Sequence, residues 1–214
     1  MNRKVVGLWA LLGVAAPGCA AGPKPAPEPL ASEAHRYDVA HEGRKSMAFG
    51  NYKVVDIRRK WKKQSAKAFF VKAVEESSQE FSFKMYRDAD LSTVQCKRSS
   101  SGASVGNISV SDGEQMLCDI DGVPGGSPWK IVLAHRGSND VTGRLMKSGV
   151  DISIAGGRPP SITTPRNYVL GDDVAAVDVG PKAETVWLAK HLDPETSYAV
   201  AATLSALMVY DDLR

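Results

Sequence analysis

This sequence lacks long apolar runs and is poor in cysteine. A helix that crosses a bilayer needs about 20 consecutive apolar residues. The two longest apolar stretches, Val5–Ala16 and Tyr198–Tyr210, hold only twelve and thirteen residues. Three cysteines among 214 residues exclude a disulfide-stapled miniprotein and a cysteine-rich zinc site.

Sequence motifs for the common cofactors are also absent. There is no phosphate-binding loop, and no glycine-rich turn lies between a strand and a helix. The histidines stand in separate segments without the spacing of metal ligands, at His35, His41, His135 and His191. We therefore expect no metal and no cofactor, and the sequence names no catalytic residue.

Two short motifs match the sequence pattern of a functional site, but the flanking sequence does not predict the structure that such a site needs. Gly102–Gly106 fits the G-x-S-x-G pattern of a nucleophile elbow, which needs a strand before the serine and a helix after it. A serine-rich turn precedes it here and a strand-like segment follows, so we expect a hairpin. Asp119–Gly122 resembles the start of a calcium loop, but no glutamate closes the loop, and a turn is expected there too.

The N-terminus, residues 1–18, has the layout of a secretory signal peptide. Two basic residues precede the apolar run, which ends in Ala16-Pro17-Gly18-Cys19. This ending resembles a bacterial lipobox, in which the cysteine is acylated and becomes the mature N-terminus, although proline at position 17 and the lack of leucine at position 16 depart from the pattern. A lipidated Cys19 is the favoured interpretation. The alternative is ordinary cleavage after Gly18 or Ala21, which would leave the protein without an anchor.

The segment 19–34 carries four alternating prolines, Pro23, Pro25, Pro27 and Pro29. Alternating proline favours extended polyproline II, which acts as a semi-rigid spacer. The order of signal, cysteine and spacer predicts a tether that holds a folded domain at the cell envelope, on a membrane through the acyl anchor. An unimportant flexible terminus is the alternative.

The charge balance excludes a basic field over the whole protein. The formal net charge is +3, and cleavage before Cys19 removes two positive residues and no negative ones, which leaves +1. Such a chain has no long-range attraction for polyanions. We expect no nucleic-acid partner, since an exported protein seldom meets one.

The rest of the chain, residues 35–214, reads as one mostly-β domain. Apolar and polar residues alternate in many short runs, such as Glu80–Tyr86 and Val150–Gly156. Turn signals separate the runs at spacings near ten residues, which is typical of an antiparallel barrel or sandwich. The stretch Lys62–Gln79 is ambiguous between a short helix and a strand followed by a loop.

The C-terminal segment is the clearest helix. Asp193-Pro194-Glu195 provides an N-cap side chain, a proline at the first helical position and an acid in the first turn. Between Tyr198 and Tyr210 only Thr203 and Ser205 are polar. An apolar run of this length favours a buried core helix, with the tyrosine hydroxyls at its two ends. A membrane-inserting helix with an exposed terminus is the alternative.

The order of these elements resembles the tubby-like domains, including the phospholipid scramblases and the plant LURP-one-related proteins. The resemblance rests on the strand ETVWLAKHL, the cap DPE, the apolar helix SYAVAATLSALMVYDD and the ladder from Trp129 to Ile154. It implies an antiparallel barrel of about a dozen strands around a buried C-terminal helix. The phosphoinositide pocket of tubby proper has no counterpart, so no lipid-binding residue is carried over.

Two cysteines remain after lipidation of Cys19. Cys96 and Cys118 lie on segments that are expected to be neighbouring strands, and an exported protein can oxidise such a pair. A disulfide is favoured, and two unpaired core thiols are the alternative.

The most suggestive surface feature is a run of cations around one aromatic residue. We name it the basic segment, and it consists of Arg58, Arg59, Lys60, Trp61, Lys62 and Lys63. Cations with an aromatic residue suit an anionic lipid surface. The alternative is a solvated strand whose cations pair with acids elsewhere. This alternative is favoured over lipid contact, because most charge runs are solvated surfaces.

Together these features predict an exported lipoprotein with a non-catalytic binding or scaffold role at the cell envelope. Its partner would be anionic lipid or an envelope protein. The alternative is an envelope hydrolase whose site is assembled from distant residues. That alternative requires a histidine within hydrogen-bond reach of a serine and an acid.

Overall fold

The computed structural model describes residues 30–66, 73–105, 108–136, 140–157, 166–180 and 183–211. The signal peptide, Cys19 and the prolines of the tether lie outside these ranges. The described elements are α1 (Leu30–Glu33), β1 (Ala34–Asp38), β2 (Ala40–His41), β3 (Met47–Phe49), β4 (Tyr52–Ala66), β5 (Ala73–Arg87), β6 (Asp90–Val105), β7 (Ile108–Asp121), β8 (Trp129–Arg136), β9 (Asp140–Lys147), β10 (Val150–Gly157), β11 (Arg166–Leu170), β12 (Ala175–Val179), β13 (Glu184–Ala189) and α2 (Pro194–Asp211).

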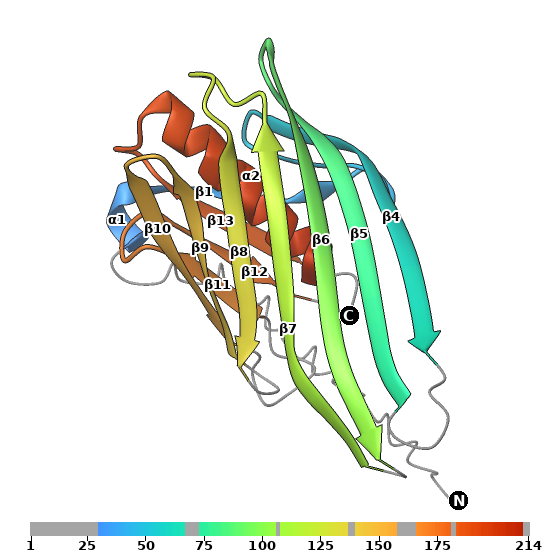
Figure 1. Ribbon diagram of the computed structural model, residues 1–214. Coiled ribbons are helices and arrows are strands. Elements are labelled where there is room, and N and C mark those ends of the chain that lie inside the picture. The colour runs from blue at the N-terminus through green and yellow to red at the C-terminus, as the bar shows by residue number, and fades with distance from the viewer. Residues whose placement is uncertain are drawn as a thin grey trace, which may run out of the picture.

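The strands form one antiparallel sheet that curls into a nearly closed barrel (Figure 1). From β2 to β13 each strand pairs with the next one along the chain, while β1 pairs with β13. Only Val39 separates β1 from β2, so the chain itself steps across the seam between the two sheet edges. The Val39 amide donates to the Glu184 carbonyl across this seam at 3.0 Å.

Helix α2 fills the barrel, which confirms the predicted fold class. Figure 1 shows it enclosed by the curved sheet. Every residue from Tyr198 to Tyr210 is buried, and burial of each large apolar side chain contributes about 1.5–3 kcal/mol. The two polar residues bond within the helix: Thr203 donates to the Ala199 carbonyl at 2.8 Å, and Ser205 donates to the Ala201 carbonyl at 2.9 Å.

Both ends of α2 are fixed by polar contacts. At the start, the Asp193 carboxylate accepts hydrogen bonds from the amides of Glu195 and Thr196, each at 3.0 Å, as the N-cap prediction requires. The Tyr198 hydroxyl donates to the Met85 carbonyl at 2.6 Å, and the Tyr210 hydroxyl bonds the Glu114 carboxylate at the other end. The alternative of an exposed, membrane-inserting terminus is therefore wrong for residues up to 211. No helix in the described ranges is long and apolar enough to span a membrane.

A small second cluster lies on the outside of the barrel. Leu30 from α1 is 1% exposed and packs with Ala176, Trp187 and Ala189 of β12 and β13. The Lys190 amide donates to the Glu33 carbonyl at 2.9 Å. The packed domain thus includes the end of the segment that the sequence analysis assigned to the tether.

The strands β4 to β7 are much longer than the others, and they continue past the C-terminal end of α2 (Figure 1). The ambiguous stretch Lys62–Gln79 belongs to them: it is strand on both sides of residues 67–72, which lie outside the described ranges. Ser104 of the G-x-S-x-G motif lies in β6, which pairs with β7 as the expected hairpin. The next described element along the chain is β7, where a nucleophile elbow requires a helix.

Candidate functional site

A β-bulge in β4 determines on which face of the strand each residue of the basic segment lies. Between the pairs Val55–Lys84 and Arg58–Ser82, two residues of β4 oppose a single residue of β5. Asp56 takes a positive φ of 55° there, and the Ile57 amide donates to the Lys45 carbonyl at 3.1 Å. Because a bulge shifts the alternation by one residue, it exchanges the inner and outer positions of the strand beyond it.

The six residues of the basic segment therefore do not share one face. Arg58 and Lys60 stand opposite Ser82 and Glu80 on the outer face. Arg59 stands opposite Phe81, whose side chain is buried inside the barrel. Trp61 follows on the same inner face. The interpretation of one continuous patch is corrected to two alternating sets on the two faces of β4.

The described members of the segment are all exposed. Arg58, Arg59 and Lys60 are exposed, and Trp61 is 62% exposed, the most of any large hydrophobic side chain in the described residues. The backbones of Lys62 and Lys63 pair with Ser78 and Ser77 in the same ladder, while their side chains lie outside the described set. A strand bonded along its length presents these groups in fixed positions.

On the outer face, Arg58 and Lys60 line a broad groove that runs across β4 to β7. Its volume is ≈ 580 Å³. One transverse row of cross-strand neighbours contains Lys60, Glu80, Lys97 and Leu117. Its lining mixes polar residues with apolar ones such as the exposed Leu117. The charged members are three cations and two acids, Arg58, Lys60, Lys97, Glu80 and Asp119.

On the inner face, a polar cluster closes the core just below α2. The Arg98 guanidinium donates to Gln79 and to Glu114, each at 2.7 Å, and lies 5.3 Å from the centre of the Tyr210 ring. Trp61 stands opposite Gln79 in the ladder. The exposed indole therefore lies at the boundary between the filled barrel and the open extension of the strands.

Cys96 and Cys118 are directly opposed on β6 and β7 and form a disulfide, with their Cα atoms 4.1 Å apart. Both side chains are buried, at 4% and 2% exposure. Cys96 belongs to the lining of the outer groove. The bond thus ties together two of the four strands that carry the groove.

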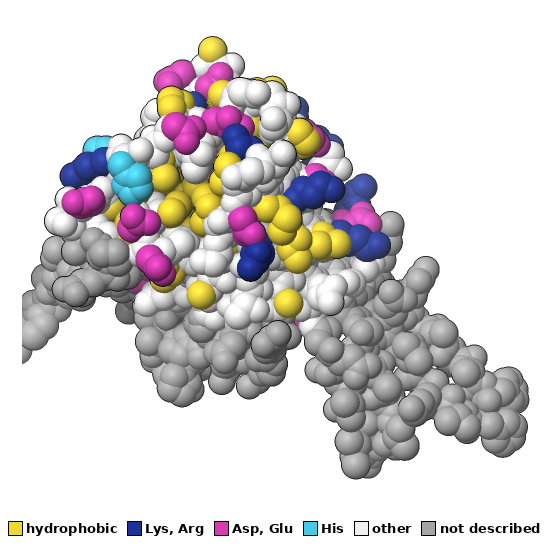
Figure 2. All heavy atoms as spheres, turned by 60° about the vertical axis from the view of Figure 1, so that its left-hand side comes forward, with side chains coloured by type: hydrophobic (Ala, Val, Ile, Leu, Met, Phe, Trp, Pro, Cys, Tyr) yellow, Lys and Arg dark blue, Asp and Glu magenta, His cyan; other side chains and the backbone are white. Residues whose placement is uncertain are grey.

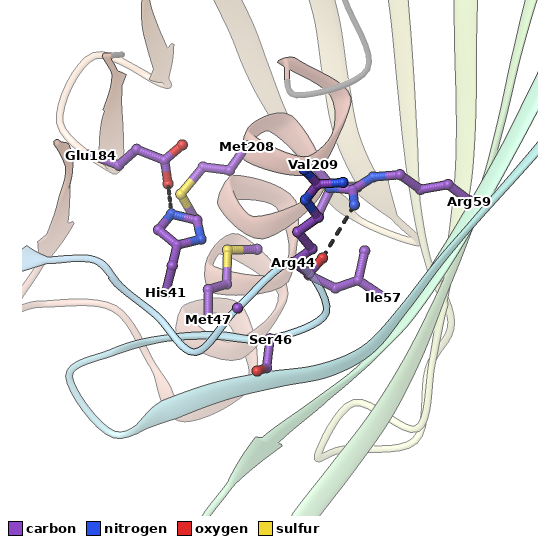
Figure 3. Close-up of a pocket in the computed structure, with 10 residues that line it drawn as sticks. His41, Arg44, Ser46, Met47, Ile57, Arg59, Glu184, Met208 and Val209 are labelled. Carbon is purple, nitrogen blue, oxygen red and sulfur yellow. Dashed lines mark hydrogen bonds and ion pairs between the residues drawn. The ribbon is translucent and has the colours of Figure 1, made fainter. Parts of the chain in front are cut away.

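One histidine has an acidic partner. His41 Nε2 lies 2.9 Å from Glu184 Oε2 across the barrel seam, beside a small cavity that Ser46 also lines (Figure 3). The Ser46 hydroxyl donates instead to the Glu42 carbonyl at 2.8 Å, and in Figure 3 it lies away from the His41 ring. The serine, histidine and acid that the hydrolase alternative requires are not assembled here.

The remaining histidines show no such arrangement in the described residues. His35 and His191 are exposed, and the side chain of His135 lies outside the described set. Among the residues that the structure describes, no group of three or more His, Cys, Asp or Glu side chains could hold a metal ion.

Sequence reasoning missed one polar cluster, which lies at the start of α2. Lys147 Nζ lies 2.6 Å from Glu195 and 4.8 Å from the centre of the Trp129 ring, and the Trp129 indole donates to Glu195 at 3.2 Å. Glu195 alone gave a local signal, as an acid in the first helical turn. The other two come from distant strands, so no spacing rule could have joined them. The buried indole and paired charges indicate a helix anchor.

Away from these clusters, charges of both signs are mixed. Figure 2 shows a face on which acidic and basic side chains are interspersed, with no large area of one sign. This agrees with the small net charge of the chain. Any attraction for an anionic partner must therefore come from local groups.

Comparisons with protein-family models, with curated proteins and with solved structures found no match to this chain. The resemblance to tubby-like domains stays a prediction. The barrel around a C-terminal helix is observed in the structure, independently of that resemblance.

Proposed function

We propose that the protein is an exported envelope lipoprotein whose barrel domain binds an anionic lipid surface, without catalysis, through the basic segment. The observation that carries this proposal is the 62% exposure of Trp61, which follows the exposed cations Arg59 and Lys60 on a strand hydrogen-bonded to β5. Tryptophan is also the side chain that prefers the boundary between lipid and water.

The expected strength of this contact is modest. Each cation close to an anionic bilayer contributes about 1 kcal/mol. Because Arg59 shares its face of β4 with Trp61 while Arg58 and Lys60 lie on the other face, either set supplies about 1–2 kcal/mol. A second attachment makes such contacts stable, because two weak membrane signals act together. The acyl anchor predicted on Cys19 is that second attachment.

The predicted tether is short. An extended polyproline segment rises about 3.1 Å per residue, so the eleven steps from Cys19 to Leu30 would span about 34 Å. Leu30 packs on the outer wall of β12 and β13. The anchor therefore keeps the whole domain near the bilayer surface, where a local basic patch is effective.

The test is vesicle flotation of residues 30–214, which contain every described helix and strand. Vesicles of neutral phosphatidylcholine are compared with vesicles that also contain an anionic lipid. The variant Arg58→Glu, Arg59→Glu, Lys60→Glu is run beside a control of equal charge change, Lys53→Glu, Lys130→Glu, Lys190→Glu, whose three lysines are exposed elsewhere.

We expect flotation with anionic vesicles only, abolished by the first variant and largely kept by the control. Equal loss in both variants would show a response to net charge alone. Absence of flotation of the unmodified domain would leave the basic segment as a solvated strand and would direct the search to envelope proteins.

A further inference from the structure

A small cavity at the barrel seam gathers residues from four distant parts of the chain. Its volume is ≈ 20 Å³, enough for about one water-sized occupant. His41 and Glu184 lie on one side of it, while Met47 and Met208 come from β3 and from the last turns of α2 (Figure 3). The cavity belongs to neither the groove nor the basic segment's inner cluster, although Arg59 contributes to its lining.

Both methionines are almost completely buried, at 2% exposure each. Each brings a thioether sulfur to the cavity lining. Thioethers are soft, neutral ligands that select soft monovalent ions such as Cu(I), whereas carboxylates and carbonyls suit hard ions. Two thioether side chains and one imidazole thus line the same small cavity.

The His41 ring is oriented as metal-binding histidines commonly are. A carboxylate can only accept a hydrogen bond, so Glu184 at 2.9 Å takes the proton of Nε2. In the neutral ring this leaves the lone pair on Nδ1, and Figure 3 shows that nitrogen turned away from Glu184 toward the side where Met47 lies. Metal-ligating histidines usually donate their other ring N–H to a carboxylate or carbonyl in this way.

The surrounding charges favour an ion of low charge. Arg44 and Arg59 also line the cavity, and the Arg59 guanidinium donates to the Arg44 carbonyl at 3.2 Å. Two nearby guanidinium groups oppose a divalent ion more strongly than a monovalent one. The single charge of Cu(I) is balanced by Glu184.

We propose that His41, Met47 and Met208 bind one Cu(I) ion, with Glu184 as the positioning residue that holds the imidazole. The proposed ligands are distinct from the lipid-binding residues, because none of the three belongs to the basic segment, although Arg59 of that segment also lines the cavity. His41 is half-exposed, with 49% of its side chain accessible, so an ion can reach the cavity from solvent.

The test is an anaerobic titration of the whole chain, purified in mild detergent, with Cu(I) in competition with the coloured chelator bicinchoninate. The variants are Met47→Leu, Met208→Leu and Glu184→Gln. Met116→Leu is the matched control, because Met116 is equally buried, at 1% exposure, but does not line the cavity. Leucine conserves volume, so the fold should tolerate each methionine change, and a thermal unfolding curve without copper checks this.

We expect one Cu(I) per chain and copper–sulfur scattering in the X-ray absorption spectrum. Loss of an outer partner of a metal ligand weakens binding about 10- to 100-fold, which is the expectation for Glu184→Gln. Each cavity methionine variant removes a proposed ligand and should weaken binding at least as much, while Met116→Leu should match the unmodified chain.

Three results would overturn the proposal. They are no binding by the unmodified chain, unchanged affinity in a Met47→Leu, Met208→Leu double variant, and a copper spectrum with nitrogen and oxygen neighbours only. None of these results bears on vesicle flotation, so the two proposals can fail separately.

Discussion

The part of the barrel that α2 fills and the row of β4 to β7 at the C-terminal end of the helix belong to the same strands, but their inner faces differ in the described residues. Where α2 lies, one transverse row of inner residues is Phe83, Val94 and Ile120, all fully buried. Two rows further along the same strands, Gln79 and Arg98 are the cross-strand partners. Between the two rows lies the pair Phe81–Cys96.

This difference shows that the side chains on the inner face of the strands depend on what packs against that face. Apolar residues line the wall along the helix. At the level of Tyr210, whose hydroxyl bonds Glu114, polar residues join them, and Arg98 stands opposite the buried Met116. A strand buried on its inner face needs strict apolar alternation, whereas a strand open on both faces tolerates charge. Stability should therefore reside in the filled part and binding in the extension.

The largest effect is expected from a change inside the filled part. Leu204 lies in the middle of α2 and is 0% exposed. Leu204→Ala should lower the free energy of unfolding by about 2–5 kcal/mol, because it removes buried methyl groups and leaves a cavity that the stiff barrel cannot close. Urea denaturation of residues 30–214 measures this. A loss under about 1 kcal/mol would mean that the helix is loosely held.

Removal of the Cys96–Cys118 disulfide should have the next largest effect. The double variant Cys96→Ala, Cys118→Ala should lose about 3 kcal/mol, because the unfolded chain regains the freedom of the loop between the two residues. Thermal unfolding with and without reductant provides the comparison. The unmodified domain should respond to reductant, and the double variant should not.

The elements that the sequence predicted well are those with local signals. The cap at Asp193 and the unbroken apolar run placed α2, and the alternation in segments such as Glu80–Tyr86 placed the strands. Cys96 and Cys118 could be paired because their strands are consecutive in a meander. In each case the deciding interaction lies within one element or between neighbours in sequence.

The features that the sequence could not give depend on backbone detail or on distant contacts. The bulge at Asp56 needs a positive φ at a residue that is not glycine, and nothing local announced it. Without the bulge, the basic segment could not be divided correctly between two faces. His41 and Glu184 are 143 positions apart, and only closure of the barrel brings them together.

A smaller effect is expected at the start of α2. Asp193→Ala should cost about 1 kcal/mol, because the amides of Glu195 and Thr196 lose their cap. Hydrogen bonds from Thr196, first from its side chain and then from its backbone, lower the pKa of Asp193 below its ordinary value. The folded state therefore gains stability from this carboxylate above the unfolded pKa of about 4, and loses it as the pH falls through the lower folded pKa.

Comparison of the variant Asp193→Asn with the unmodified domain measures how much the titration of Asp193 contributes to stability. Asp193→Asn keeps a capping oxygen and removes the ionisable group. Its stability near neutral pH should be close to that of the unmodified domain, and the difference between them should shrink further in acid. Urea denaturation from pH 7 to pH 3 gives the curve, and a difference that grows in acid would contradict the cap as the source.

The smallest effect on stability is expected at Trp61, in the extension. Its side chain is largely exposed, so Trp61→Ala should change the free energy of unfolding by less than about 0.5 kcal/mol. The same indole gives a sensitive reading of contact, because Trp129 and Trp187, the other tryptophans of residues 30–214, are buried at 0% and 4% exposure. Anionic vesicles should therefore shift the tryptophan fluorescence of the unmodified domain to the blue and leave Trp61→Ala unchanged. A shift that persists in the variant would mean that vesicles open the filled barrel, and the division between a stable core and a binding extension would fail.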